Sequence, residues 1–354
     1  MLGPDDRLLL YMEGAFEQGT GKMGLGILRY GQTPTCVIVD SLGTPTPSSA
    51  PVPSPGTPTP PSAPIPSNIP VVASLKEAMA YNPTVFVLGI APPGGKVPDE
   101  WWPVIDEAVA LGLKVVNGLH DRIAPRYPNL PPGQWIWDVR EEPPGLTTAT
   151  GAARLLSCKR ILTIGTDMSI GKMTAGLELD LALRRAGVKS VFAATGQTGM
   201  VICGRGVPLD AVRLDFAPGA IEREVCDLGG DADVVVVEGQ GSLLNPASSA
   251  TLPLIRGSMP THFLLCHRAG MTELPRYPWI KVPPLMDVVK LYQDLAETCG
   301  CFQRPSLLGV CLDTRELAEQ AARVELDKVS NELQVPCADP VRFGVSELVA
   351  GITG

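Results

Sequence analysis

A glycine-bounded loop in the middle of the chain carries the residues best suited to hold a phosphate group. The apolar run 161–164 predicts a buried strand, residues 165–171 form the loop, and a helical pattern follows. In such a turn, backbone N–H groups and the positive helix end face the anion, and a lysine adds a mobile charge. We expect the phosphate site to be formed by Gly165, Thr166, Asp167, Ser169, Gly171, Lys172, Met173 and Thr174.

The loop departs from the usual P-loop pattern in two ways. Gly165 and Gly171 enclose one residue more than G-x-x-x-x-G-K-[ST] allows, and Met173 stands where the metal-binding hydroxyl belongs. A second segment, 234–241 (VVVVEGQG), reads as a buried strand that ends at Glu238. A carboxylate at that place suits a metal ligand, a general base or a cap on a neighbouring loop.

Further polar residues follow other apolar runs. His267 and Arg268 end one such run, and they suit proton transfer and carboxylate binding respectively. Residues 195–199 (TGQTG) suit a second ligand-facing loop, with Gln197 at its centre. Asp215 is a candidate partner of Glu238 for a metal or a proton. Two more arginines are available for an acidic substrate, Arg205 and Arg213.

The elements that must position these residues alternate along the second half of the chain, 146–354. Strands are expected at 161–164, 190–194, 234–237, 262–266 and 307–310, and helices at 174–186, 218–228, 284–298 and 314–332. This alternation predicts a P-loop NTPase-like, doubly wound parallel sheet. Ligands of such sheets bind at the carboxyl ends of the strands, where all the candidate residues lie.

The first part of the chain, residues 1–145, predicts a Rossmann-like domain. Strands at 8–12, 35–39, 85–90 and 114–117 alternate with helices at 21–30, 74–81 and 98–111, and a short apolar piece begins at 71–72. A proline-rich stretch, 44–70, interrupts the pattern as an extended surface insertion, because it has no core-forming periodicity. Residues 19–24 spell G-x-G-x-x-G, but they follow the first strand too late for a dinucleotide fingerprint.

Composition narrows the choice of partners. The 354 residues carry a net charge of −8, 5% aromatics and no Lys/Arg run, which argues against nucleic acid and anionic membranes. No apolar run reaches the length of a membrane helix, and the acidic N-terminus is not a signal peptide. The nine cysteines fall mostly in apolar or helical patterns, as in reduced proteins. We expect a cytoplasmic homo-oligomer that acts on a small molecule.

The motifs as a set resemble one bacterial family, the DgcN-type D-glutamate N-acetyltransferases, long grouped as a domain family of unknown function. The matching segments are GKMGLGILRYG, VIVDS, GTDMSIGKMT, ATGQTGMVICGRGVPLD, DFAPGAIE, VVVEGQGSLLNP and LLCHRAGM. The resemblance implies an acetyl-CoA-dependent transfer to an acidic D-amino acid, without a metal. Glu238 or His267 would then be the catalytic base, and Gln197, Arg205 and Arg268 would contact the substrate.

Two other functions stay open. The loop GTDMSIGK and the segment VEGQG also resemble dethiobiotin synthetase, which implies an ATP- and Mg²⁺-dependent ligase or kinase. In that case Thr174, Asp215 and Glu238 would hold the metal. The third possibility is a non-catalytic nucleotide-binding regulatory protein.

Overall fold

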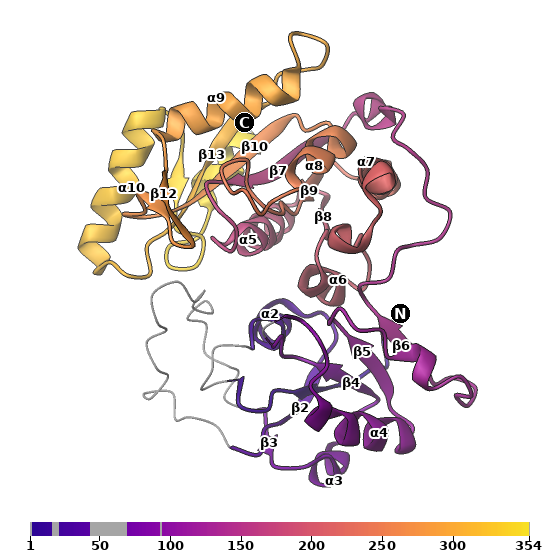
Figure 1. Ribbon diagram of the computed structural model, residues 1–354. Helices are drawn as coiled ribbons and strands as arrows, with labels where there is room; N and C mark the ends of the chain where they lie inside the picture. The colour runs from indigo at the N-terminus through magenta and orange to yellow at the C-terminus, as the bar shows by residue number, and fades with distance from the viewer. Residues whose placement is uncertain (1, 16–20, 43–68, 93, 354) are drawn as a thin grey trace. The chain divides into compact units, whose positions relative to one another are not determined.

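A computed structural model describes residues 2–15, 21–42, 69–92 and 94–353 (Figure 1). The chain forms two compact units: unit 1 comprises Met1–Glu142 and Gln197–Ala211, and unit 2 comprises Pro143–Gly196 and Val212–Gly354. The chain thus leaves unit 2 once, for residues 197–211, and returns. Residues 44–68 of the expected proline-rich insertion, and the first two residues of the 19–24 glycine pattern, lie outside the described residues.

Unit 1 is built on a six-stranded sheet in the order β3-β2-β1-β4-β5-β6, and every neighbouring pair is parallel. This is the strand order of the Rossmann fold, as predicted. All four residues of β1 and of β4 are buried, because both faces of a parallel sheet are covered. The strands are β1 (Leu8–Tyr11), β2 (Thr35–Val39), β3 (Val71–Val72), β4 (Val85–Leu88), β5 (Lys114–Asn117) and β6 (Ile136–Asp138).

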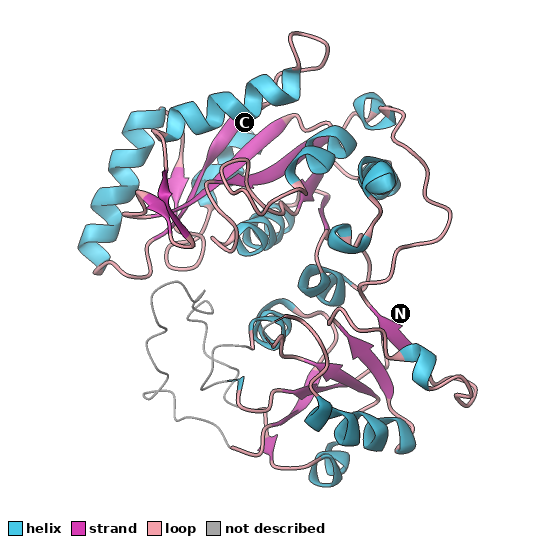
Figure 2. Cartoon of the chain, in the orientation of Figure 1, coloured by secondary structure: helices cyan, strands magenta, loops and turns pink. Residues whose placement is uncertain are grey.

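The helices of unit 1 lie on both sides of its strands (Figure 2). They pack in two pairs, α2 with α6 and α3 with α4. Their bounds are α2 (Lys22–Tyr30), α3 (Leu75–Ala78), α4 (Trp102–Ala110) and α6 (Gln197–Cys203). Residues 195–199 were expected to form a ligand-facing loop. Only residues 195–196 of this range lie outside a helix, because α6 begins at Gln197.

Unit 2 holds a second parallel sheet, in the order β14-β13-β10-β7-β9-β8. The strand before the glycine-bounded loop, β7, lies between β10 and β9, so the ends of β10 and β9 flank the loop. The strands are β7 (Lys159–Gly165), β8 (Ser190–Ala193), β9 (Val234–Val237), β10 (His262–Arg268), β13 (Ser306–Asp313) and β14 (Cys337–Ala338).

Helices and one hairpin complete unit 2. The helices are α5 (Lys172–Arg185), α7 (Ala217–Gly229), α8 (Thr251–Ser258), α9 (Leu285–Glu297), α10 (Glu319–Leu333) and α11 (Ser346–Thr353). The hairpin, β11 (Glu273–Leu274) with β12 (Tyr277–Lys281), follows β10.

The prediction of a helix from residue 314 is wrong for its first five residues. Thr314 is fully buried, and its N–H and hydroxyl both donate to the Asp339 carboxylate, so the chain is held in a loop until α10 begins at Glu319. Both α/β units nevertheless have the predicted class and order.

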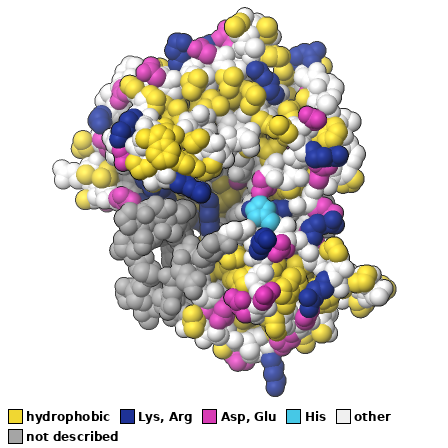
Figure 3. All heavy atoms as spheres, in the orientation of Figure 1, with side chains coloured by type: hydrophobic (Ala, Val, Ile, Leu, Met, Phe, Trp, Pro, Cys, Tyr) yellow, Lys and Arg dark blue, Asp and Glu magenta, His cyan; other side chains and the backbone are white. Residues whose placement is uncertain are grey.

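Three surface and composition features complete the fold. Acidic and basic side chains are interspersed on the face shown in Figure 3. Across the described residues, no helix is both long enough and apolar enough to cross a membrane. All nine cysteines are free thiols, and Cys299 and Cys301 lie exposed in the turn that follows α9.

Candidate functional site

The loop between β7 and α5 has the backbone conformation of an anion site. Ser169 and Gly171 both take left-handed conformations, with φ of 56° and 98°. Such residues turn successive N–H groups toward the inside of a loop. The N-cap of α5 is Gly171, which has no side chain to cap the helix, and the N–H groups of the first turn point out of the helix end. The predicted strand, loop and helix are therefore present in unit 2, and α5 begins at Lys172 rather than Thr174.

Lys172 lies inside the curve of this loop. Its side chain is buried, with 6% exposure, and its Nζ donates to the backbone oxygen of Asp167 at 2.7 Å. A Cβ on Gly165 would lie 2.8 Å from Ile170 Cδ1 and 3.3 Å from this Nζ. A side chain at residue 165 would therefore displace Ile170 and crowd the lysine.

Two polar side chains that the sequence analysis did not single out hold this loop to the segment after β9. Asn245 donates from Nδ2 to Asp167 Oδ1 at 2.6 Å, and both side chains are buried. The Tyr292 hydroxyl donates to the Gly165 oxygen at 3.0 Å and accepts from the Leu243 N–H at 3.0 Å. The Asp167 carboxylate therefore serves the loop itself, since its Oδ1 also accepts from the Met168 N–H.

Glu238 follows β9 and is buried, as expected for the end of a central strand. Its Oε2 accepts from the N–H groups of Thr195 at 2.9 Å and Gly196 at 3.2 Å, and the Thr195 hydroxyl donates back to the Glu238 oxygen. The carboxylate thereby positions the turn after β8. The next residue, Gly239, passes so close to β7 that a Cβ would lie 1.7 Å from the Thr163 oxygen. This close approach explains the glycine that follows the glutamate.

His267 contacts the phosphate loop from β10. Its Nδ1 lies 2.9 Å from the hydroxyl of Thr166, which is fully buried. Burial of the ring lowers the pKa of His267 from 6.5 to about 4; the Glu325 carboxylate opposes this shift, and Arg268 adds to it. The imidazole is therefore neutral at neutral pH and has one nitrogen able to accept a proton.

The remaining predicted residues are more scattered. Arg268 ends β10 beside Asp313, which ends β13. Gln197 and Arg205 belong to unit 1, where Arg205 is exposed. Asp215 is exposed on a short 3-10 turn, Leu214–Phe216. Among the described residues, no group of three or more His, Cys, Asp or Glu side chains is placed to hold a metal ion.

Comparison with known proteins assigns the family. The DUF1611_C P-loop domain, a domain of unknown function, matches residues 147–349, and the DUF1611_N Rossmann-like domain matches residues 55–142. This chain belongs to the DUF1611 family. The match confirms both predicted domain types and the family expected from the motifs.

Three known proteins are similar over most of the chain. A D-glutamate N-acetyltransferase of Tritonibacter scottomollicae is 36% identical over 78% of this chain and 83% of its own length. One from a Pseudoalteromonas species is 33% identical over 79% and 84%. A crystal structure of a DUF1611 family protein from Anabaena variabilis is 43% identical, covers 98% of this chain and 99% of its own, and superposes with a TM-score of 0.89.

Proposed function

We propose that this chain is an N-acetyltransferase that transfers the acetyl group of acetyl-CoA to the amine of D-glutamate. The observation that carries the proposal is the similarity to two D-glutamate N-acetyltransferases over about four fifths of the chain. The geometry of unit 2 supports it, because it joins an anion-binding loop to a buried neutral histidine at one edge of a sheet.

The phosphate loop suits the diphosphate of coenzyme A. The N–H groups of the first turn of α5 and the Lys172 ammonium would hold it, and a Cβ on Gly171 would meet no described atom within 4 Å, so there is room beside the backbone. Met173 replaces the hydroxyl that binds Mg²⁺ in nucleotide hydrolases, and holding a diphosphate does not require that hydroxyl. Coenzyme A would supply the acetyl thioester.

His267 is the better of the two candidate bases. In the proposed reaction the amine nitrogen bonds to the thioester carbon, the carbon–sulfur bond breaks, the thiolate leaves and takes up a proton, and the amine loses one. Neutral His267 can accept that proton, with Thr166 fixing the ring. Glu238 already uses one oxygen to hold two backbone N–H groups, so we assign it the positioning of the 195–196 turn. Loop N–H groups would stabilise charge on the carbonyl oxygen.

The test is a turnover assay of the purified chain with acetyl-CoA and D-glutamate, which follows the free thiol and identifies the product by mass spectrometry. We expect N-acetyl-D-glutamate, and weaker turnover of L-glutamate. His267→Asn should lower kcat by about 100-fold, the usual contribution of a general base, while the affinity for acetyl-CoA is kept. Glu238→Gln should lower kcat less than His267→Asn does. No acetylation of any amino acid would refute the proposal.

One observation favours a second candidate, an ATP-dependent ligase or kinase. Glu238 follows β9, the neighbour of the phosphate-loop strand β7, which is where a metal-binding carboxylate would be useful. This function predicts that ATP raises the melting temperature only in the presence of Mg²⁺. The acetyltransferase predicts that acetyl-CoA does so without added metal. Stabilisation by nucleotide with no turnover of any substrate would instead indicate a regulatory protein.

A further inference from the structure

Arg268 is an arginine with unused hydrogen-bonding capacity at the carboxyl edge of the unit 2 sheet. Its side chain is 19% exposed, and its Nε is buried. Within the described residues this Nε has no hydrogen-bond partner, and Asp313 Oδ2 lies 3.8 Å away, beyond hydrogen-bonding distance. A guanidinium has five N–H donors, and leaving them unpaired in a mostly buried place is unfavourable. Such an arrangement suits a ligand that brings its own acceptors.

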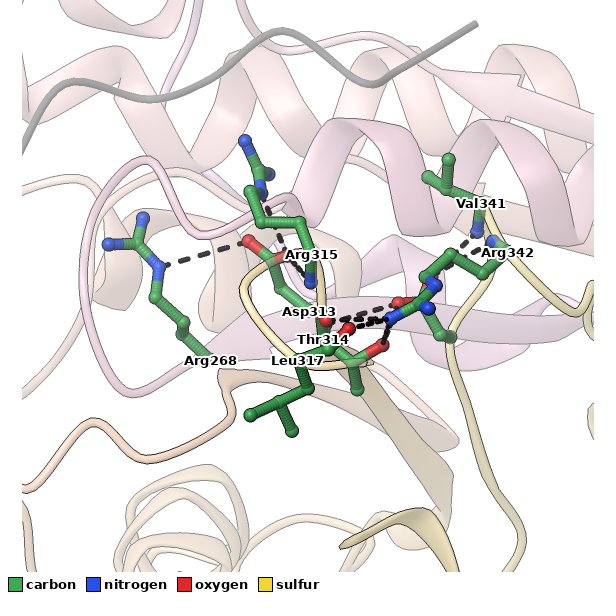
Figure 4. Close-up of polar contacts among 8 residues, drawn as sticks. Arg268, Asp313, Thr314, Arg315, Leu317, Val341 and Arg342 are labelled. Carbon is green, nitrogen blue, oxygen red and sulfur yellow. Dashed lines mark hydrogen bonds and ion pairs between the residues drawn. The ribbon is translucent and has the colours of Figure 1, made fainter. Parts of the chain in front are cut away.

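Among the described residues, Asp313 accepts hydrogen bonds through one of its two carboxylate oxygens. Its Oδ1 accepts from both the backbone N–H and the Nε of Arg315, at 3.2 and 2.8 Å. Its Oδ2 is buried and, like Arg268 Nε, makes no hydrogen bond to the described part of the chain. Figure 4 shows the two arginines reaching the carboxylate from different sides. The guanidinium groups of Arg268 and Arg315 both pair with the Asp313 carboxylate.

The cluster stands on a rigid support. The parallel register pairs Arg268 with Asp313 across β10 and β13. The loop after Asp313 is fixed by Asp339, which accepts from Thr314, and by Arg342, which donates from Nη1 to the backbone oxygens of Thr314 and Leu317 at 2.8 and 2.9 Å (Figure 4). Arg268 therefore lies at the end of a strand, and its neighbour Asp313 is held by the surrounding loop. A selective binding site requires such a fixed geometry.

We propose that Arg268, backed by Asp313, binds the side-chain carboxylate of the acidic acceptor and so selects a dicarboxylic amino acid. This inference rests on the proposed function. An arginine pairs with a carboxylate through two parallel N–H···O bonds, which is both strong and directional. Among the described residues, Asp313 pairs with the Arg268 guanidinium by charge and accepts no hydrogen bond from its Nε, while Arg315 holds Asp313 in place.

The position on β10 favours the side-chain carboxylate over the α-carboxylate. His267 and Arg268 are successive residues of a strand, so their side chains leave opposite faces. The amine must reach His267, and the α-carboxylate is only two bonds from the amine nitrogen. The side-chain carboxylate is four bonds away, so it can extend further from the imidazole, toward the guanidinium on the other face of the strand.

The test compares two substrates in the full-length enzyme, D-glutamate and D-glutamine, which have nearly the same size but differ in side-chain charge, because an NH2 group replaces one carboxylate oxygen. In Arg268→Gln, kcat/KM for D-glutamate should fall by about 10- to 100-fold, as expected when a charge-assisted pair is lost. The value for D-glutamine should change by less than about threefold, since that substrate makes no such pair. Arg268→Lys should retain part of the preference.

Arg304→Gln is the matched control. Arg304 precedes β13 at the opposite edge of the sheet and forms ion pairs with Asp294 and Glu297, so this variant removes the same charge away from the cluster. It should keep the wild-type ratio between the substrates. The melting temperature of Arg268→Gln should stay close to that of the wild type, because Arg315 still pairs with Asp313.

Two results would overturn the inference. The first is that kcat/KM of Arg268→Gln falls equally for both substrates and its melting temperature falls as well, which would make Arg268 structural. The second is that the ratio of kcat/KM between the two substrates is unchanged in Arg268→Gln. Calorimetric binding of glutarate, a dicarboxylate without an amine, separates this inference from the proposed function. If the wild type binds glutarate, Arg268→Gln does not, and neither acetylates D-glutamate, the carboxylate site stands and the acetyltransferase assignment fails.

Discussion

The same tripeptide, Gly-Lys-Met, begins a helix after the first strand of each sheet. The two copies differ in the backbone conformation of the glycine and in the burial of the lysine. In unit 1, Gly21 precedes α2 with φ of −79°, Lys22 is exposed and Met23 is buried. In unit 2, Gly171 precedes α5 with φ of 98°, and the lysine that follows it is buried. An identical local sequence thus turns its charge outward in one unit and inward in the other.

The difference lies in what fills the space beside the glycines. In unit 1 the Met12 side chain fills it, because a Cβ would lie 2.8 Å from Met12 Cε at Gly21 and 2.0 Å from Met12 Sδ at Gly24. In unit 2 a Cβ on Gly171 would meet no described atom within 4 Å. The spacing of glycines in a sequence shows only that the backbone lies close to another group, either a side chain or a ligand. Whether that is a side chain or a ligand depends on the residues that end the preceding strand.

Acidification should have the largest effect on stability, because the unit 2 loop contacts the buried His267 through Thr166. The unfolded chain binds a proton at His267 below pH 6.5, whereas the folded ring stays neutral down to about pH 4. The unfolded state then binds more protons, so stability falls as the pH drops through this window, by at most about 3 kcal/mol.

Urea unfolding at several pH values, in the wild type and in His267→Asn, measures this contribution. The variant should lose less stability on acidification than the wild type does. Parallel curves for the two proteins would show that His267 does not titrate as its burial implies.

The two lysines provide the next test. Lys172→Ala should weaken acetyl-CoA binding by about 2 kcal/mol, or roughly 30-fold, because a charge-assisted contact to the ligand is lost. Lys22→Ala removes the same charge from the equivalent position of α2 and should bind acetyl-CoA as the wild type does. Isothermal titration measures both. If the two variants bound acetyl-CoA equally well, the two lysines would not differ in their contribution to ligand binding.

Substitution of Gly24 should destabilise the protein because a larger side chain would collide with Met12. Gly24→Ala places a methyl group against Met12 and 3.1 Å from the Gly89 oxygen, and should lower the free energy of unfolding by about 1 to 2 kcal/mol. In a Met12→Ala background the same substitution should destabilise much less, because the space is vacated. A double-mutant cycle from urea unfolding gives the coupling energy. Additive effects would mean that Met12 does not account for this glycine.

Substitution of Gly171 should destabilise the protein through backbone strain, and this loss of stability should be the smallest of the four effects. Gly171→Ala forces an L side chain into a left-handed conformation and should destabilise unit 2 by roughly 1 kcal/mol. The neighbouring space is open, so no second substitution should relieve it. Gly21→Ala in unit 1 should instead be sensitive to Met12→Ala. The same unfolding measurements check both, and relief of Gly171→Ala by a neighbouring truncation would contradict the assignment.

The sequence predicted the parts of the molecule that depend on local pattern. The valine run of β9 and the leucines of β1 are long enough to mark buried central strands, and Gly165 to Lys172 mark their own turn. The shorter strands β6 and β14 escaped notice because two or three residues show no periodicity. The early start predicted for α10 failed because Thr314 is held by Asp339, 25 residues away.

The site was only partly predictable for the same reason. Asn245 reaches Asp167 across 78 residues, and Tyr292 reaches Gly165 across 127. An asparagine before a proline reads as a turn, and a tyrosine on the apolar face of α9 reads as core. The position of Glu238 at a strand end was correctly expected, but its two backbone N–H partners depend on the neighbouring strand β8. Tertiary pairing, which no local pattern records, decides these roles.

The excursion of residues 197–211 has a consequence for how such genes can evolve and be dissected. These residues are encoded inside the P-loop half of the reading frame, yet they complete unit 1, where α6 packs against α2. A truncation after residue 142 would leave α2 without that helix, and the complementary fragment would carry a helix without its proper neighbours. A single recombination event therefore cannot transplant either unit intact, which favours inheritance of the pair as one indivisible gene.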